Sequence, residues 1–205
     1  MELQNWFEKG EKLKPVIDLY VDVFYQRASY ERHFLIIVQA LEAYHRLTRK
    51  NEILPKDEHK LKISSILNSV PLEHKEWLQA RLNFSNEPSL HERLEDLFEP
   101  IKDIENPNYP MADFLFEFGN KDRTAIIRNI KNTRNYNTHF DESLKKKTVK
   151  GNELIYLTSM LIAMLEYYLM KELGLNEKII LNITKDRMRN ISSSYSYFNA
   201  IKMKL

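Results

Sequence analysis

The sequence Phe34-Leu35-Ile36-Ile37-Val38-Gln39-Ala40-Leu41-Glu42-Ala43-Tyr44-His45-Arg46 gives the clearest indication of how this chain folds. Its large apolar residues recur at the three- and four-residue spacing that places side chains on one face of an α-helix. They are Phe34, Ile37, Val38, Leu41 and Tyr44. We therefore predict a helix over residues 30–50 that buries this face in the core.

The composition extends the helical prediction to the whole chain. Only 4 of the 205 residues are glycine, too few for the hairpin turns of a sheet protein or the phosphate loop of a Rossmann fold. No repeat and no long linker divides the chain, so we predict an all-α fold in one domain over residues 1–205. Further helices are expected at residues 13–25, 57–69, 72–84, from Ser89, from about 122 into 134–139, and at 152–173.

Local residues predict where these helices begin and end. Pro15 is expected in the first turn of the helix over residues 13–25, and Ser89 with Glu92 has the spacing of a capping box. Gly174 suits the C-terminal cap of the long apolar helix before it. Residues 106–110, Asn-Pro-Asn-Tyr-Pro, predict a loop, and the serines of residues 192–196 are expected to interrupt helical periodicity.

Charge and composition exclude several classes of function. The formal net charge is only +2, so a nucleic-acid site must be a local basic patch. Cysteine is absent, and the histidines lack the spacing of metal ligands, so we expect neither a metal nor another cofactor. The start of the chain does not resemble a signal peptide. Residues 154–170 include Glu166 and are expected to be too short and too polar to span a membrane, which predicts a soluble, cytoplasmic protein.

Chemistry is concentrated in the hexapeptide Arg134-Asn135-Tyr136-Asn137-Thr138-His139. Arginine can neutralise a phosphate through a planar pair of hydrogen bonds, and histidine can transfer a proton near neutral pH. Together they suit phosphodiester cleavage, in which a nucleophile loses a proton and charge develops on phosphorus. On these six residues alone, however, a solvated helix end with ordinary polar side chains is the favoured interpretation.

Helical geometry limits what the hexapeptide can do. Arg134 and His139 diverge by roughly 140° on an ideal helix, whereas Asn135 and His139 are four residues apart and share a face. A continuous helix therefore cannot form a complete site from Arg134 and His139 alone. Either the helix frays here, or a second copy completes the site across a two-fold axis, with one histidine as base and the other as acid.

Two further groups of residues are candidates for the same site. Gln39, Glu42 and Arg46, with His45 beside them, lie in an apolar helix where polar side chains need partners. Glu42 could hold Arg134, but an internal Glu42–Arg46 pair at four-residue spacing is an equally good interpretation.

The second group is basic and forms the densest local patch in the sequence. It could guide a polyanion toward His139, although lysine-rich loops usually serve solubility. The patch comprises Arg128, Lys131, Arg134, Lys145, Lys146 and Lys147.

Two of these segments resemble a known family. Residues 34–46 resemble the signature helix of ApeA-type HEPN domains, which occur at the C-terminus of bacterial anti-phage, abortive-infection proteins. Residues 6–25 resemble the lead-in of the same domain. Residues 134–139 match the HEPN motif of an arginine, a polar residue and a following histidine. The two motifs occur in the expected order and span most of the chain.

The resemblance implies a HEPN-like helical bundle with additional helices, which dimerises and cleaves RNA such as tRNA without a metal. It implies attack by the RNA 2′-hydroxyl, leaving a 2′,3′-cyclic phosphate. In this scheme His139 is the acid or base, Arg134 stabilises the phosphorane and Asn135 positions His139. Glu42 and Arg46 would be supporting residues.

Other interpretations remain open at this stage. A non-catalytic HEPN-like module would bind a nucleotide or a protein through the same cleft, and a purely structural helical dimer would not need His139. ApeA-type proteins usually carry an additional, largely β N-terminal domain, which is not found in these residues. The chain is therefore expected to be a C-terminal piece that works with such a sensor domain, or a stand-alone relative.

Overall fold

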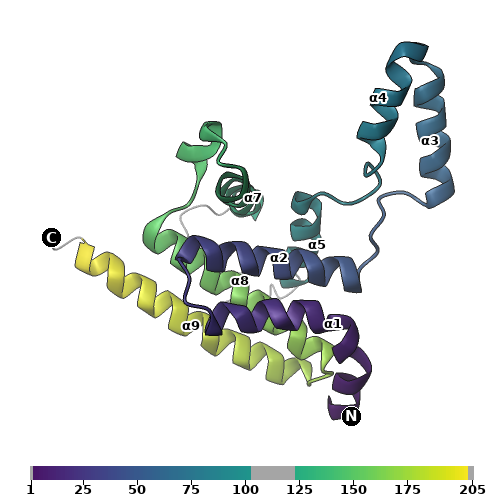
Figure 1. Cartoon of the computed structure of the whole chain (residues 1–205). Helices are drawn as coiled ribbons and strands as arrows, with labels where there is room; N and C mark the ends of the chain where they lie inside the picture. Colours follow the sequence, from purple (N-terminus) through teal and green to yellow (C-terminus); the bar gives the residue numbers. More distant parts are fainter. Residues whose placement is uncertain (1, 103–122, 203–205) are drawn as a thin grey trace.

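The computed structural model describes residues 2–102 and 123–202, and within them every regular element is a helix (Figure 1). This confirms the predicted all-α fold class. The elements are α1 (Glu2–Tyr25), α2 (Tyr30–Thr48), α3 (Lys56–Asn68), α4 (Leu72–Leu82), α5 (Leu90–Lys102), α7 (Arg123–His139), the 3-10 helix η1 (Glu142–Lys147), α8 (Gly151–Glu172) and α9 (Glu177–Lys202).

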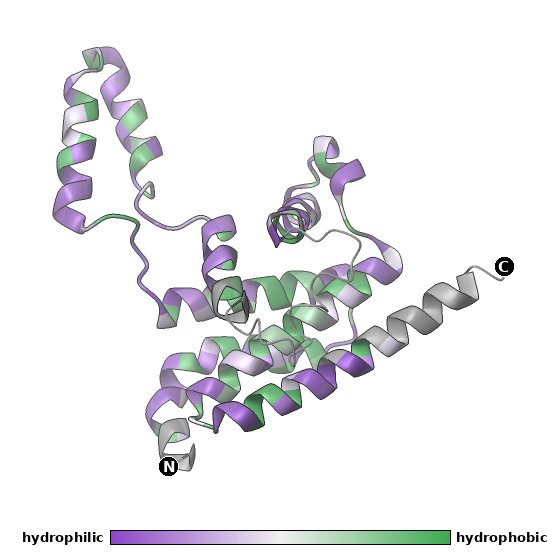
Figure 2. Cartoon of the chain, turned by 180° about the vertical axis from the view of Figure 1, so that it is seen from behind, coloured by the Kyte–Doolittle hydropathy of each residue, from purple (hydrophilic) through white to green (hydrophobic). Residues whose placement is uncertain are grey.

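Helix α8 lies at the centre of the core and contacts α1, α2 and α9. Figure 1 shows these four helices side by side, and the green colouring of Figure 2 gathers where they meet. All five residues of the predicted apolar face of α2 are buried, which confirms that prediction. Tyr44 on α2 and Tyr168 on α8 pack with their ring centroids 5.0 Å apart. The hydroxyl of Tyr168 donates to the carbonyl of Leu97 on α5.

By length and composition, α8 is long and apolar enough to cross a membrane, so the expectation that it is too short and too polar is wrong. The helix extends beyond residues 154–170 at both ends and has 22 residues. However, 67% of its most apolar window is buried inside the protein. Its apolar side chains are therefore largely covered by the neighbouring helices.

Helices α5 and α7 pack against α2 and against each other. The predicted inward residues of α7, Ile126, Ile127 and Ile130, are all buried. This packing places Arg134, in the hexapeptide of α7, 3.9 Å from Glu42 in the middle of α2. The second motif is thereby brought next to the first, although the two are far apart in the sequence.

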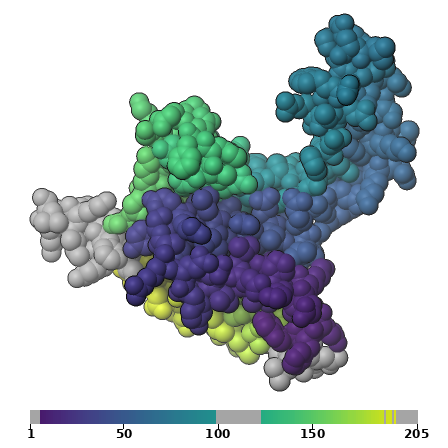
Figure 3. All heavy atoms as spheres, viewed as in Figure 1, coloured from purple at the N-terminus to yellow at the C-terminus, as the bar shows by residue number. Residues whose placement is uncertain are grey.

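Helices α3 and α4 form an arm that projects away from the body (Figure 1). Neither helix has a buried residue, and Leu61 and Trp77 are 73% and 63% exposed. At the base of the arm, the Asn86 side chain accepts a hydrogen bond from the Leu54 N–H at 2.9 Å and donates to its carbonyl at 3.0 Å. Figure 3 shows a notch between the arm and the lobe formed by α7 and η1.

Two helices extend well beyond the prediction. Helix α1 begins at Glu2, so Pro15 lies inside the helix and not in its first turn. Pro15 is exposed, while Leu13 and Val16 are buried, and this packing outweighs the hydrogen bond that proline cannot make. Helix α9 continues through residues 192–196, because serine lowers helix propensity only modestly and does not stop a helix as glycine or proline does.

The local cap predictions agree with the structure where it describes them. The Ser89 N–H donates to Glu92 Oε2 at 2.7 Å, and the Glu92 N–H donates to Ser89 Oγ at 3.4 Å, which completes the capping box. Gly174 has a φ of 78° and ends α8 as expected. The loop predicted at residues 106–110 lies outside the described residues.

The position of α8 in the core predicts a large cost for truncating its buried side chains. We expect Leu161→Ala, at a position with 0% exposure, to lower the free energy of unfolding by about 2–5 kcal/mol in urea titrations. Leu61→Ala on the exposed arm is the matched control, with an expected change of about 0.5 kcal/mol or less. Equal losses for the two variants would contradict this assignment of the core.

Candidate functional site

Helix α7 runs without interruption to His139, so the alternative in which it frays within the hexapeptide does not occur. Phe140 follows with a φ of 54°, a left-handed conformation that ends the helix. Its N–H donates to the Tyr136 carbonyl at 2.7 Å, which closes the last turn. The side chains of Arg134 and His139 therefore keep the divergence of roughly 140° that an ideal helix dictates.

Arg134 faces α2 and contacts the residue that was its predicted partner. Its Nη2 lies 3.9 Å from Glu42 Oε2, and its Nη1 donates to Asn135 Oδ1 at 3.2 Å. The side chain of Arg134 is 33% exposed, so the guanidinium lies beside Glu42 and Asn135 and remains accessible at the surface. This arrangement suits a cation that binds an incoming anion.

His139 lies on the opposite side of α7 and is exposed. Within the described part of the chain, its ring makes no hydrogen bond or ion pair, and Asn135 bonds to Arg134 and not to His139. Next to it, hydrogen bonds from the Ser143 hydroxyl and N–H lower the pKa of Asp141, with smaller contributions from Lys147 and His139. His139 therefore has an ionised carboxylate as its neighbour.

The predicted basic residues divide between α7 and η1. Arg128 is exposed and lies at helical spacing on the same face as Asn135 and His139, and Lys131 is half-buried nearby. The Val149 N–H donates to the buried Thr133 Oγ1 at 3.0 Å, which holds the segment after η1 against α7. The predicted patch is thus brought to one lobe.

One lysine of this patch has a local counter-ion. Lys145 Nζ donates to both oxygens of Glu142, at 3.0 and 3.2 Å, and this hydrogen-bonded carboxylate raises its pKa. Lys146 and Lys147 are exposed. Lys146 and Lys147, with Arg128, are therefore the better candidates for contacting a polyanion.

Behind Arg134, a series of ion pairs and hydrogen bonds connects α7, α2 and α5, and we call this series the charge chain. Glu42 Oε1 lies 3.9 Å from Arg46 Nη2, and Arg46 Nη1 lies 2.8 Å from Glu87 Oε2. Both candidate partners of Glu42, Arg134 and Arg46, are therefore present at once. The members of the chain are Arg134, Glu42, Arg46, Glu87, Arg93, His45, Asp96 and Arg49.

Arg93 and His45 form the buried part of the charge chain, with 1% and 3% exposure. Arg93 Nη1 lies 3.1 Å from His45 Nδ1. Because a guanidinium only donates, Nδ1 must be the acceptor, and the proton of the neutral ring is on Nε2, 3.3 Å from Asp96 Oδ2. Burial is the main cause that lowers the pKa of His45, which fits this neutral form.

The sequence analysis missed Arg93, Glu87 and Asp96 as members of this site. One signal was available for Arg93, which occupies the apolar stripe of α5 with Leu94 and Leu97. A charged residue at such a position needs partners in the core. Its partners, however, come from α2 and from the connection before α5, which no local pattern indicates.

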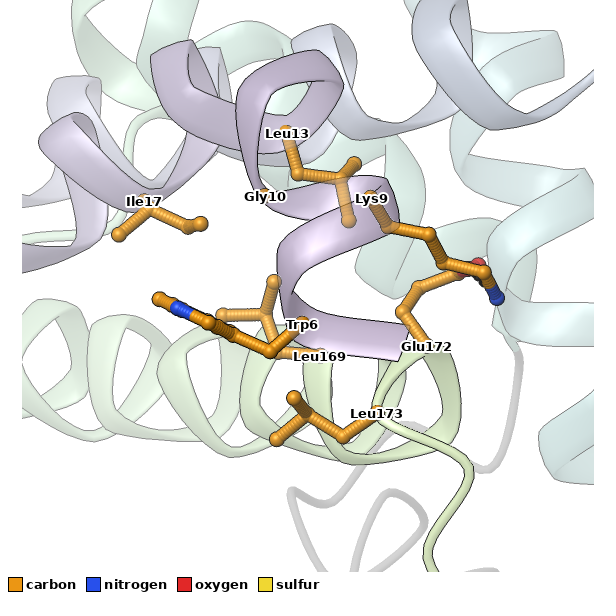
Figure 4. A pocket seen from close by; sticks show the side chains of 8 residues that line it. All are labelled: Trp6, Lys9, Gly10, Leu13, Ile17, Leu169, Glu172 and Leu173. Atoms are coloured by element: carbon orange, nitrogen blue, oxygen red, sulfur yellow. Dashed lines mark hydrogen bonds and ion pairs between the residues drawn. The ribbon is translucent and has the colours of Figure 1, made fainter. Parts of the chain in front are cut away.

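Two other features do not form a competing site. In the parts of the chain that the structure describes, no group of three or more His, Asp or Glu side chains could hold a metal ion. A pocket between α1 and the end of α8, lined by Trp6, Leu13, Leu169 and Glu172 among others, has a volume of about 20 Å³ (Figure 4). That is room for about one water and not for a nucleotide.

The profile of the Apea-like HEPN family matches residues 35–179. The matched segment covers more than half of the chain and contains most of α2 and the hexapeptide of α7, so this chain belongs to the Apea-like HEPN family. Searches of curated proteins and of solved structures found no match.

The lowered pKa of His45 makes the stability of the protein depend on pH. In the unfolded chain, His45 has the ordinary histidine pKa near 6.5, whereas burial in the folded protein lowers this pKa. His45 should therefore destabilise the fold as the pH falls below about 6.5, and this effect should be absent above it. In urea titrations, we expect the free energy of unfolding to fall less between pH 7.5 and 5.5 for His45→Gln than for wild type. An unchanged pH dependence would contradict a buried, neutral His45.

Proposed function

We propose that this protein is a metal-independent endoribonuclease that acts in the cytoplasm as an effector of anti-phage defence. The observation that carries the proposal is the HEPN hexapeptide in an Apea-like HEPN chain, with Arg134 supported from behind by Glu42 and open to an anion at the surface. RNA such as tRNA is the proposed substrate, because exposed single-stranded loops can be bound by a small basic patch.

In the proposed reaction, the 2′-hydroxyl of RNA attacks the adjacent phosphorus. The 2′ oxygen forms a bond to phosphorus, and the bond from phosphorus to the 5′ oxygen breaks, leaving a 2′,3′-cyclic phosphate and a 5′-hydroxyl. A His139 imidazole accepts the 2′ proton, and an acid returns a proton to the leaving oxygen. Arg134 stabilises the negative charge on the phosphorane through its planar pair of donors.

A second copy of the chain would supply the missing half of this site. Arg134 and His139 project from different sides of an unbroken α7, so one copy does not direct both at a single phosphate. In a two-fold dimer the two hexapeptides meet in one cleft, where one His139 acts as base and the other as acid. The amide of Asn135 would orient the imidazole once Arg134 engages the phosphate.

The basic lobe would guide the RNA toward this cleft. Arg128 lies along the His139 face of α7, and Lys146 and Lys147 are exposed on η1. Their charges would attract the phosphate backbone without reading its sequence.

A second candidate function is a non-catalytic module that binds a nucleotide or a protein. The observation in its favour is that His139 has no hydrogen-bond partner to orient its ring within the described chain. Such a module would use Arg134 for an anionic group and would tolerate changes at His139.

Substitution at His139 separates the two candidates. We expect His139→Ala to abolish cleavage of total tRNA in EDTA while leaving the helical circular dichroism unchanged, because the side chain is exposed and acts only in proton transfer. Wild type should leave 2′,3′-cyclic phosphate and 5′-hydroxyl ends. Cleavage by the purified variant at the wild-type rate would overturn the assignment of His139.

Arg134→Lys is the companion variant. It keeps the charge but loses the two-pronged donor geometry, so cleavage should also be lost. RNA binding without cleavage by wild type, unaffected by His139→Ala, would favour the binding module instead.

The shared cleft predicts that one defective copy inactivates a dimer. When wild type and His139→Ala are mixed in equal amounts under conditions that exchange subunits, about a quarter of the dimers are fully wild type. We expect activity to fall to about that fraction, and to follow the square of the wild-type fraction across a titration. A linear dependence would mean that each copy carries an independent site.

A further inference from the structure

The Glu42 carboxylate lies near two arginines and forms a hydrogen bond with neither. Its Oε1 lies 3.9 Å from Arg46 Nη2, and its Oε2 lies 3.9 Å from Arg134 Nη2. Both distances exceed that of a hydrogen bond. Arg46 is also four residues after Glu42 on α2, the spacing at which a glutamate and a basic residue pair readily on a helix. Another interaction must therefore prevent Arg46 from forming a close ion pair with Glu42.

That interaction is with Glu87. Arg46 Nη1 and Glu87 Oε2 are 2.8 Å apart, the length of a charge-assisted hydrogen bond. This contact is shorter by about an ångström than either contact of Glu42, so Glu87 is the main partner of Arg46. The guanidinium of Arg46 is thereby drawn toward the start of α5.

Glu87 is itself fixed by groups outside α2. Its N–H donates to the Phe84 carbonyl at 3.1 Å, and the preceding Asn86 holds Leu54 through two side-chain hydrogen bonds. On the other side, the buried Arg93 Nη2 lies 3.6 Å from the same Glu87 oxygen. The backbone at Glu87 is therefore held in place, and its carboxylate lies between the guanidinium groups of Arg46 and Arg93.

From these contacts we infer that Glu87 is a positioning residue for Arg134. By engaging Arg46, it leaves one oxygen of Glu42 free to hold the Arg134 guanidinium at the surface of α7. Without the Glu87 carboxylate, the Arg46 guanidinium moves to pair with Glu42. Arg134 then loses its contact with the Glu42 carboxylate. The inference rests on the proposed function, because it gives Arg134 its orientation for the phosphorane.

A merely structural role for Glu87 makes a different prediction. If Glu87 only tied the base of the arm to α5, its loss would lower stability and would not be repaired by a change at Arg46. If it acts by diverting Arg46 from Glu42, removing the Arg46 charge as well should return Glu42 to Arg134. Rescue by the second substitution therefore distinguishes the two roles.

The test measures tRNA cleavage by Glu87→Gln, an isosteric change that removes only the charge. We expect kcat to fall about tenfold with little change in KM, because Arg134 acts on charge that develops in the transition state. Glu87→Gln combined with Arg46→Gln should recover most of that loss. Glu95→Gln is the matched control, since Glu95 lies on α5, pairs with His91 at 3.5 Å and is outside the charge chain. Wild-type kcat in Glu87→Gln, or no recovery in the double variant, would overturn the inference.

A second readout does not depend on catalysis. The Nε–Hε resonance of Arg134, assigned by its absence in Arg134→Lys, should shift when Glu42 is changed to Gln. In the Glu87→Gln background, the same change at Glu42 should shift the Arg134 resonance much less, because Glu42 is already paired with Arg46 and no longer contacts Arg134. Equal shifts in the two backgrounds would overturn the inference even in a protein that cleaves no RNA. If the shift is smaller in the Glu87→Gln background as expected, but wild type cleaves no RNA, the proposed function alone is overturned.

Discussion

The burial of one face of α2 against α8 is the constraint on which the rest of the molecule depends. Phe34, Ile37 and Leu41 have 0% exposure, and each such side chain contributes about 1.5–3 kcal/mol when removed from water. Because this face lies in the core, the rotation of α2 about its own axis is fixed. Glu42 then lies within reach of Arg134 on α7, and Arg46 within reach of Glu87 just before α5.

Beside this face, the buried charge of Arg93 is only partly compensated, because its Nε and Nη2 make no hydrogen bond among the described residues. Arg93 takes the place of an apolar residue in the stripe of α5, and its burial would be costly without partners. His45 accepts one of its hydrogen bonds as a neutral ring, and Glu87 supplies a nearby negative charge. The charge chain therefore extends from a nearly dry interior to the exposed edge of Arg134.

The geometry of α7 connects the fold to the proposed chemistry. An unbroken helix ending at His139 presents Arg134 toward α2 and His139 toward solvent, so the two residues of the motif have different surroundings. Arg134 is supported, and His139 is available to a second molecule. A dimeric site is consistent with this division, because each copy would contribute an oriented cation and an accessible imidazole to the other.

The residues alone were sufficient to deduce an all-α fold, the buried face of α2, the capping box at Ser89 and the helix that carries the hexapeptide. Such features depend on periodicity and on contacts a few residues apart, which the order of residues encodes directly. The extension of α1 through Pro15 and the continuity of α9 were decided by tertiary packing and by the weakness of serine as a helix breaker. The sharing of Glu42 between Arg46 and Arg134, and the roles of Glu87 and Arg93, likewise required the tertiary structure. These ion pairs join segments that lie far apart in the chain, and only the packing of α2, α5 and α7 brings their charges within reach of one another.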